Sequence, residues 1–342
     1  MKPKVVHADA ADIDALTPER AALAQAGAEL ICAGARAFDD ILAAAHDCDV
    51  LLVDDAMITR EILAALPRCL AIIRYGIGYD SVDTQAATEH GILVVNMPGF
   101  CSEEVANHTL LFLLACAKKL IRLDRGLRAG QWPDTRTLDS ILAPMGSIYG
   151  ERLGLIGFGG IGRAVAHRAQ AFGLHVSASD PLVDQAVFDR HSVQQAELDA
   201  ILETSDYVSL HTPLLPETRH LLDAKRLRLM KRSAYLINTS RGAIVDQAAL
   251  IKALREGWIA GAALDVFEDE PLPGDSPLLN MDNVVVTPHV AFYSDASFAR
   301  LRRRVGEEAA RVVSGQWPTA IVNPEVKGRS RLEKRFLQNG RT

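Results

Sequence analysis

The stretch that decides the fold is "RLGLIGFGGIGRAVAHRAQAFGLHVSASD", residues 152–180. An apolar run leads into a glycine-rich turn, a helical segment follows, and a second apolar run ends at Asp180. In such a turn Gly157 makes the sharp bend, Gly159 lets the backbone approach a diphosphate, and Gly162 lets helix and strand pack closely. The N-terminus of the helix supplies N–H groups that bind phosphate. The stretch therefore predicts a dinucleotide site in a strand–helix–strand unit.

Asp180 indicates which dinucleotide is bound. It ends the second apolar run, at the place where a carboxylate accepts hydrogen bonds from the ribose hydroxyls. The same carboxylate repels a 2′-phosphate, and no Arg or Lys follows until Arg190. The sequence therefore favours NAD over NADP. A purely structural turn without a ligand is the weaker alternative.

Apolar runs that alternate with helical segments occur in two series along the chain. Strands that are apolar throughout and separated by helices indicate parallel sheets covered on both faces. The sequence therefore predicts an α/β protein with two doubly wound parallel-sheet domains. The expected strands are residues 4–7, 28–32, 49–54, 70–74 and 91–96 in the first series, and 152–158, 174–179, 207–212, 234–240, 259–266 and 283–288 in the second.

Two long helical segments suggest how the domains are connected. One is predicted from Ser102 to about Leu120, and the other spans 294–314, with a serine before it and Gly315 after it. If both carry the chain between domains, the second domain is an insertion in the first. We therefore expect a substrate domain of residues 1–100 and 291–325 and a dinucleotide-binding domain of residues 101–290.

Two further segments carry weaker signals. Residues 124–150 have several Gly and Pro and weak periodicity, which indicates connecting structure in which Trp132 and Ile141 need cover. The tail after Ile321 is basic and polar, and its last part, residues 326–342, is expected to be loosely ordered.

Composition narrows the class of protein. The 342 residues are 49% hydrophobic and 23% charged, with a net charge of −6, which argues against nucleic acid or an anionic membrane as a partner. We expect no membrane span, because the longest apolar run is too short to cross a bilayer, and no signal peptide at the N-terminus. The five cysteines show no metal-type spacing, so we expect reduced thiols, no metal site and a cytoplasmic location.

Polar residues follow three of the expected strands in the second series. Arg241 comes after 234–240, Glu270 after 259–266, and His289 after 283–288. Taken singly, each has an ordinary explanation, as a surface ion pair, a loop acid before proline or a core histidine. Because the carboxyl ends of parallel strands form one edge where ligands bind, we expect the three to face the dinucleotide together. The planar fork of Arg241 suits a carboxylate.

The earlier segment "RYGIGYD", residues 74–80, resembles a second glycine turn without the third glycine. It is either a simple strand-to-helix turn or a loop whose N–H groups bind an anion such as a carboxylate.

Several long segments, in order, resemble the D-isomer-specific 2-hydroxyacid dehydrogenase family over residues 1–325. The resemblance implies a Rossmann NAD-binding domain inserted in a flavodoxin-like substrate domain, and a homodimer formed through the cofactor domain. It also implies catalytic roles for Arg241, Glu270 and His289. The matching segments are "RYGIGYDSVD", "GLIGFGGIG", "LHTPLLPETRHLL", "NTSRGAIVDQAAL", "AGAALDVFEDEPLP" and "TPHVAFYS".

Further site residues are implied by the same resemblance. Those expected at the substrate are Arg74, Tyr75, Gly76, Ile77, Gly78 and Phe292. Those expected at the cofactor are Gly157, Gly159, Gly160, Ile161, Gly162, Asp180, Thr212, Pro213, Thr218, Thr239, Ser240, Arg241, Asp265 and His289.

The resemblance implies that the chain interconverts a small 2-keto acid and its D-2-hydroxy acid with NAD. In this hypothesis Arg241 holds the carboxylate, and His289, beside Glu270, exchanges the proton. The segments are most similar to a branch that contains phosphoglycerate dehydrogenases and C-terminal-binding corepressors, so an NAD(H)-sensing interaction protein is the alternative. The corepressor has a tryptophan where this sequence has Phe292. A formate-oxidising enzyme is disfavoured, because that branch lacks the glutamate. The sequence does not identify the substrate.

Overall fold

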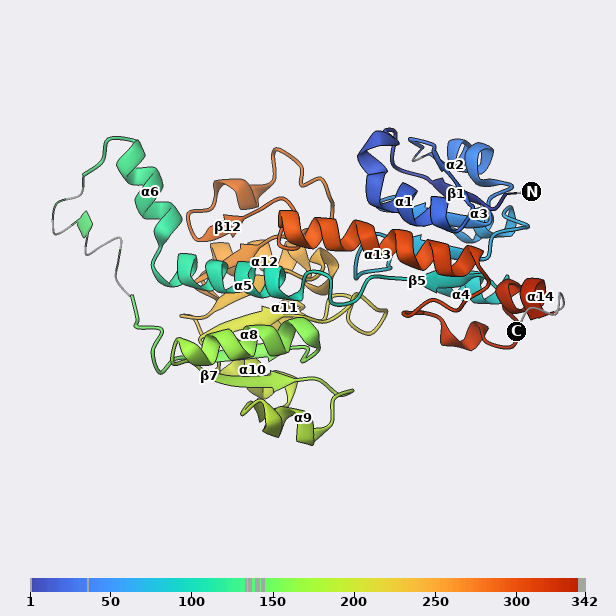
Figure 1. Ribbon diagram of the computed structural model, residues 1–342. Helices are drawn as coiled ribbons and strands as arrows, with labels where there is room; N and C mark the ends of the chain where they lie inside the picture. The colour runs from blue at the N-terminus through green and yellow to red at the C-terminus, as the bar shows by residue number, and fades with distance from the viewer. Residues whose placement is uncertain are drawn as a thin grey trace. The chain divides into compact units, whose positions relative to one another are not determined.

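The computed structural model describes residues 2–35, 37–132, 134, 137–138, 142 and 145–337. The chain divides into two compact units, which we call the first unit (residues 1–100 and 294–342) and the second unit (residues 101–293). Each unit is built on one parallel β-sheet with helices packed against it (Figure 1). The predicted α/β class with two doubly wound parallel sheets is confirmed.

The sheet of the first unit has the strand order β2-β1-β3-β4-β5, which is the flavodoxin-like order. Its central strand is entirely apolar, and all four of its residues are buried, as expected for a strand covered on both faces. The strands are β1 (Lys4–His7), β2 (Glu29–Cys32), β3 (Val50–Val53), β4 (Ala71–Arg74) and β5 (Leu93–Val95).

Helices cover both faces of this sheet. One face packs against α2, α3 and α4, and α13 lies against β3 and β4 with α1 beside it. The helices are α1 (Thr17–Gln25), α2 (Phe38–Ala45), α3 (Arg60–Ala64), α4 (Thr84–Glu89), α13 (Asp295–Val313) and α14 (Arg331–Leu337). The predicted start of α13 is confirmed, because Ser294 caps it with a complete capping box.

The sheet of the second unit has the order β12-β11-β10-β9-β6-β7-β8, the Rossmann arrangement with one further strand. The six strands expected from the sequence are present. The seventh, β8, was not predicted, because its two residues are exposed glutamines with no apolar pattern. The strands are β6 (Arg152–Ile156), β7 (His175–Ser179), β8 (Gln194–Gln195), β9 (Tyr207–Leu210), β10 (Tyr235–Asn238), β11 (Gly261–Leu264) and β12 (Val284–Val286).

Successive residues of these strands enter two different cores. Leu236 faces the core formed with α10, α11 and α12, whereas Ile237 faces the core formed with α5, α8 and α9. The helices are α5 (Ser102–Ala117), α6 (Leu120–Arg128), α8 (Gly160–Ala171), α9 (Gln185–Arg190), α10 (Leu198–Thr204), α11 (Ala224–Leu227) and α12 (Gln247–Arg255). The helix predicted from Ser102 to about Leu120 is present and ends at Ala117; Lys119, with a left-handed φ of 50°, separates it from α6.

The described part of the tail differs from its prediction, whereas residues 338–342 lie outside the described residues. Residues 322–337 are not loose: Asn323 accepts a hydrogen bond from the Val94 N–H at 2.8 Å, and α14 buries Leu332. On the same helix, Arg335 pairs with the buried Asp49 at 2.5 Å. A basic, polar tail is ordered here because its arginines find buried acceptors in the first unit.

The predicted connecting segment is partly helical, since α6 extends to Arg128. Trp132 is 83% exposed, so the described residues do not provide the expected cover, and Ile141 lies outside them. Within the described ranges, no helix is long and apolar enough to cross a bilayer. All five cysteines are free thiols.

Candidate active site

The glycine turn of the second unit has room for glycine only. Gly157 has a φ of 97°, and a Cβ there would lie 2.5 Å from the carbonyl oxygen of His211. A Cβ on Gly162 would lie 2.4 Å from the carbonyl oxygen of Gly157. These contacts bring the turn, the end of β9 and the first turn of α8 into close packing. The sequence therefore uses glycines where the backbone needs either a positive φ or a close approach.

Gly159 has the opposite surroundings, and they fit a diphosphate. A Cβ on this residue would meet nothing within 4 Å, so its surface is open. Gly159 is the N-cap of α8, and the first-turn N–H groups of Gly160, Ile161 and Gly162 have no acceptor within the helix. Open space above a helix N-terminus with free donors is a suitable place for a phosphate group. The residues present fit the dinucleotide that the sequence predicts.

Asp180 connects the end of β7 to the glycine turn. One of its carboxylate oxygens accepts from the Phe158 N–H at 2.8 Å, and the other accepts from the Leu182 N–H at 3.0 Å. Each carboxylate oxygen has capacity for a second hydrogen bond. The carboxylate is thus fixed beside the turn with acceptor capacity left.

Other residues expected at the cofactor also follow strands of this sheet. After β9, the Thr218 hydroxyl donates to the Pro213 carbonyl at 2.7 Å and accepts from the Leu215 N–H at 2.7 Å, which closes a compact loop. Thr212 donates to the same carbonyl at 3.2 Å. After β10, the hydroxyl of Thr239 lies 3.2 Å from that of Thr109 on α5. The loops therefore meet at the carboxyl edge of the sheet, where ligands bind in doubly wound folds.

Arg241 is held by a short hydrogen-bonded loop after β10. The Asn238 side chain accepts from the Ser240 N–H at 3.0 Å and donates to the Arg241 carbonyl at 2.9 Å. A Cβ on Gly242 would lie 1.8 Å from a backbone carbon of Phe267, so glycine lets this loop touch the one that carries Glu270. Sequence reasoning missed the bracing role of Asn238, although its place at a strand end was a usable signal.

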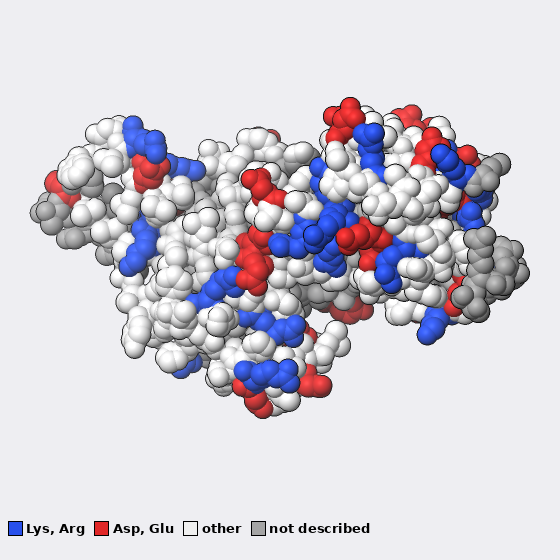
Figure 2. All heavy atoms as spheres, in the orientation of Figure 1, with Lys and Arg blue, Asp and Glu red and all other residues white. Residues whose placement is uncertain are grey.

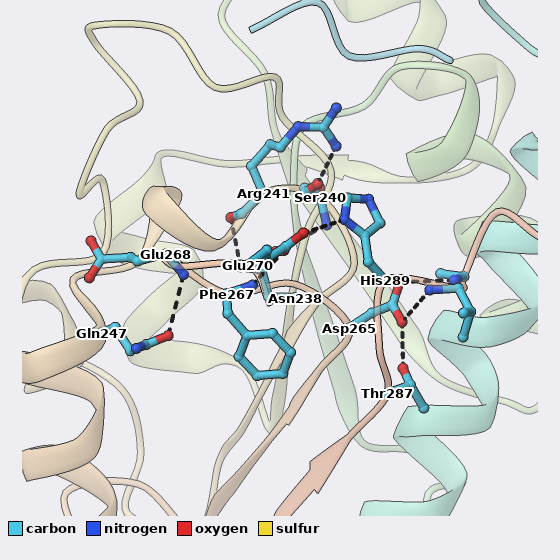
Figure 3. A network of polar contacts seen from close by, with 12 residues as sticks. Asn238, Ser240, Arg241, Gln247, Asp265, Phe267, Glu268, Glu270, Thr287 and His289 are labelled. Carbon is cyan, nitrogen blue, oxygen red and sulfur yellow. Dashed lines mark hydrogen bonds and ion pairs between the residues drawn. The ribbon is translucent and has the colours of Figure 1, made fainter. Parts of the chain in front are cut away.

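Glu270 and His289 form a direct pair (Figure 3). The Nδ1 atom of His289 lies 2.6 Å from one carboxylate oxygen, and the other oxygen accepts from the Phe267 N–H at 2.8 Å. Burial opposes ionisation, but the hydrogen bonds from His289 and Phe267, with the charge of Arg241, hold the pKa of Glu270 below its ordinary value. Because Nδ1 faces the carboxylate, the Nε2 atom is the one available to a substrate.

Asp265 fixes the backbone that carries His289. Its buried carboxylate accepts from the Thr287 hydroxyl at 2.5 Å and from the N–H groups of Val290 at 2.9 Å and Ala291 at 2.8 Å. The carbonyl of Asp265 accepts from the His289 N–H at 2.8 Å. His289 has a left-handed φ of 54°, a strained conformation for a non-glycine residue that these contacts maintain. The resemblance implies a cofactor contact for Asp265, and the geometry adds this bracing role.

His108 was not predicted as part of this region. From α5, its Nε2 atom lies 3.0 Å from the Thr287 hydroxyl and 3.9 Å from the Asp265 carboxylate. Burial lowers the pKa of His108, and Asp265 opposes that shift only in part. No local pattern marks this histidine, because its partners lie far along the chain.

The 75–78 loop belongs to the first unit and follows β4. Two of its carbonyls accept hydrogen bonds from the segment after β5. The Gly76 carbonyl accepts from the Met97 N–H at 2.8 Å, and the Ile77 carbonyl accepts from the Asn96 side chain at 2.7 Å. The N–H groups of Ile77 and Gly78 donate to no acceptor in the described part of the chain. Successive backbone donors of this kind fit an anion.

Three residues expected at the substrate differ in their surroundings. Arg74 donates to the Tyr75 carbonyl at 2.5 Å and packs on Gly76. The Tyr75 side chain is only 6% exposed and points into the first unit, because its hydroxyl donates to the buried carboxylate of Glu19 at 3.0 Å. The substrate contact expected for Tyr75 stays a prediction. The ring of Phe292 lies edge-on to His289, with centroids 6.4 Å apart.

Comparisons with known proteins show the family to which the chain belongs. Residues 110–291 match the family model described as the NAD binding domain of D-isomer specific 2-hydroxyacid dehydrogenases. A glyoxylate reductase of Korarchaeum cryptofilum is 42% identical over 288 residues, which cover 84% of this chain and 86% of that protein.

Two solved structures are similar over nearly the whole chain. A D-lactate dehydrogenase from Aquifex aeolicus, complexed with NAD and lactic acid, has a TM-score of 0.81 and 30% identity, covering 93% of this chain and 99% of that one. A glyoxylate reductase from Paecilomyes thermophila has a TM-score of 0.84 and 27% identity, covering 95% of this chain and 99% of that one. This chain therefore belongs to the D-isomer specific 2-hydroxyacid dehydrogenase family and is an NAD-dependent oxidoreductase.

Proposed function

We propose that the protein reduces a small 2-keto acid to its D-2-hydroxy acid and catalyses the reverse reaction, with His289 as the acid and base. The observation that carries the proposal is the His289–Glu270 pair, whose atoms lie 2.6 Å apart. A histidine with one nitrogen on a carboxylate and the other available is the usual arrangement for proton exchange at neutral pH.

The proton moves between His289 and the substrate oxygen. In reduction, the Nε2 atom of the imidazolium donates its proton to the carbonyl oxygen, which becomes the hydroxyl. NADH, when bound, supplies the hydride that C2 of the keto acid accepts. In oxidation, the neutral ring takes the hydroxyl proton. Glu270 is ionised at neutral pH, since its pKa is lowered, and its charge stabilises the imidazolium and orients the ring.

Two groups of donors are proposed to bind the substrate carboxylate. Arg241 supplies a planar fork that binds a carboxylate through two hydrogen bonds and polarises the neighbouring carbonyl. The N–H groups of Ile77 and Gly78 supply backbone donors. Phe292, beside His289, contributes an apolar wall. We accordingly assign the substrate loop to the first unit and the cofactor site to the second.

The cofactor is proposed to be NAD and not NADP. The N–H groups of residues 159–162 hold the diphosphate, and Asp180 accepts from the ribose hydroxyls, since each of its oxygens has acceptor capacity left. Its negative charge disfavours a 2′-phosphate. The loops at the same edge of the sheet contain other residues expected at the cofactor, which are Thr212, Pro213, Thr218, Thr239 and Ser240.

The direct test is NADH oxidation by the purified chain with a panel of 2-keto acids. Because the relatives include glyoxylate reductases, glyoxylate comes first, followed by hydroxypyruvate and longer keto acids. We expect turnover with at least one member and its loss in His289→Ala. Glu268→Gln is the matched control, since Glu268 pairs with His220, another histidine of the same unit. The proposal fails if no keto acid supports NADH oxidation, or if His289→Ala keeps full activity.

We also propose that two copies of the chain associate through the exposed apolar side chains of residues 120–132. No residue of α6 is buried, and Leu120, Leu127 and Trp132 are 51%, 53% and 83% exposed. Apolar side chains gathered on one exposed segment are typical of an interface. Light scattering after size exclusion should give a dimer for the wild type and a monomer for Leu127→Glu. The control is Leu182→Glu, at a leucine that is 91% exposed elsewhere.

A further inference from the structure

A buried polar network lies behind the 75–78 loop, within the first unit. The Tyr75 hydroxyl donates to Oε1 of Glu19, on α1, at 3.0 Å. Arg302, on α13, donates to the same oxygen from Nε at 3.0 Å and to Oε2 from Nη2 at 3.1 Å. Glu19 is fully buried, and the side chain of Arg302 is 18% exposed. The acceptor of the Tyr75 hydroxyl is therefore a carboxylate fixed by a two-pronged ion pair.

Arg302 differs from its neighbours on α13. Figure 2 shows basic and acidic side chains side by side over this helix, where Arg303 and Glu307 form an exposed pair. Arg302 instead turns inward to Glu19. A Cβ on Gly306 would lie 2.8 Å from the Cα of Glu19, so glycine lets α1 and α13 touch at this point. The backbone positions of the ion pair are thus set by direct helix packing.

His7 packs against the ring of the tyrosine. The His7 and Tyr75 rings are 4.7 Å apart between centroids, and Nδ1 of His7 accepts from the Ala10 N–H at 3.2 Å. Burial, with a smaller effect from the charge of Arg302, lowers the pKa of His7 to about 4. His7 is therefore neutral at physiological pH and serves as a packing surface. Tyr75 is held by a ring contact and by one charge-assisted hydrogen bond.

We propose that the Glu19–Arg302 pair is a positioning element for substrate binding, acting through the hydroxyl of Tyr75. The proposal rests on the proposed function, in which the N–H groups of Ile77 and Gly78 bind the substrate carboxylate. Tyr75 begins this loop, so its side chain determines where the following N–H groups lie. A hydrogen bond to an ionised carboxylate is roughly twice as strong as a neutral one, which makes it a firm anchor.

The test is Tyr75→Phe, which removes the hydroxyl and keeps the ring. We expect the KM for the keto acid to rise about tenfold, the usual effect of one lost hydrogen bond to a charged group. kcat should change by less than about twofold and NADH affinity should not change, because a loop that binds the carboxylate before and during the reaction contributes uniform binding. The control is Tyr207→Phe, which removes a buried hydroxyl bonded to Glu151 in the second unit and should leave the KM unaltered.

Two further measurements separate positioning from stability alone. Calorimetric titration of acetate into the NADH complex reports carboxylate binding without turnover, and its affinity should fall in Tyr75→Phe by the same factor as the KM rises. In a double-mutant cycle, Glu19→Gln should raise the KM in the wild type but add little in Tyr75→Phe.

The proposal is overturned if Tyr75→Phe lowers the melting temperature while acetate affinity and KM stay within about twofold of wild type. It is also overturned if the two substitutions act additively. Failure of the proposed function would give a different result, namely a wild type that turns over no keto acid. Titration with acetate would then still show whether carboxylate affinity depends on Tyr75.

Discussion

Glu270→Gln tests the proton-exchange pair most sharply. The variant keeps the shape of the side chain. In the wild type the Phe267 N–H donates to Oε1 of Glu270 at 2.8 Å, and the amide oxygen of the variant can accept the same hydrogen bond. The amide nitrogen then faces Nδ1 of His289 and donates to it. Such a bond requires an unprotonated Nδ1, so the substitution removes the charge that favours the imidazolium and adds a contact that favours the neutral ring.

The size of the effect follows from the distance. The two atoms lie 2.6 Å apart, and both side chains are about a third exposed, at 38% and 35%, so water screens the pair strongly. Coulomb's law for unit charges at this separation in water gives about 1.6 kcal/mol. Since 1.36 kcal/mol corresponds to one pH unit, the limb of the activity profile that depends on this pair should move by about one pH unit in the variant.

The assay is the pH–rate profile in both directions. Reduction needs the protonated ring, so its alkaline limb should move about one unit lower, with activity recovered in acid. Oxidation needs a neutral ring with an unprotonated Nε2, so its acid limb should also move lower, but its maximal rate should fall because an amide that donates to Nδ1 leaves the ring proton on Nε2. NADH affinity should stay constant.

Glu268→Gln is the control, because it removes a carboxylate that is paired with His220. Its profile should shift much less. If the alkaline limb of Glu270→Gln coincides with that of the wild type, or if Glu268→Gln moves it equally, Glu270 does not act on His289 as proposed.

Three other substitutions test separate parts of the structure. Arg241→Lys keeps the charge but loses the planar fork, so kcat/KM should fall by about 10²-fold for every keto acid; a near-normal value would make the arginine structural. Asp180→Ala should narrow the preference for NADH over NADPH by about tenfold in cofactor titrations, and an unchanged ratio would remove the residue from the ribose site. Arg335→Met removes a partner of Asp49, whose pKa is held below its ordinary value by Arg335 and Lys4 against the opposing effect of burial. A carboxyl with a lowered pKa stabilises the fold at neutral pH and stops doing so in acid, so the loss of about 1–3 kcal/mol in urea unfolding at pH 7 should shrink below about pH 4.

The amino-acid sequence by itself determined the two parallel sheets and the glycine turn. Both depend on local patterns: strands that are apolar throughout must be covered on both faces, and Gly157 and Gly162 stand where a Cβ would strike backbone. The same reasoning placed Glu270 and His289 after neighbouring strands, and the register of β11 and β12 brings those strand ends to one edge. Strand ends in a parallel sheet converge whatever the details of packing.

Only the tertiary structure decided where individual side chains point and what they contact. Tyr75 turns inward because Glu19, on a distant helix, offers a buried carboxylate. Residues 322–337 of the tail are ordered because Arg335 reaches Asp49, and no periodicity in a basic segment shows that partner. The sequence pattern fixes which residues are apolar and where the backbone can bend. Hydrogen-bond partners far apart along the chain are chosen by packing, since a buried polar group must be satisfied by whichever donor or acceptor the fold brings within reach.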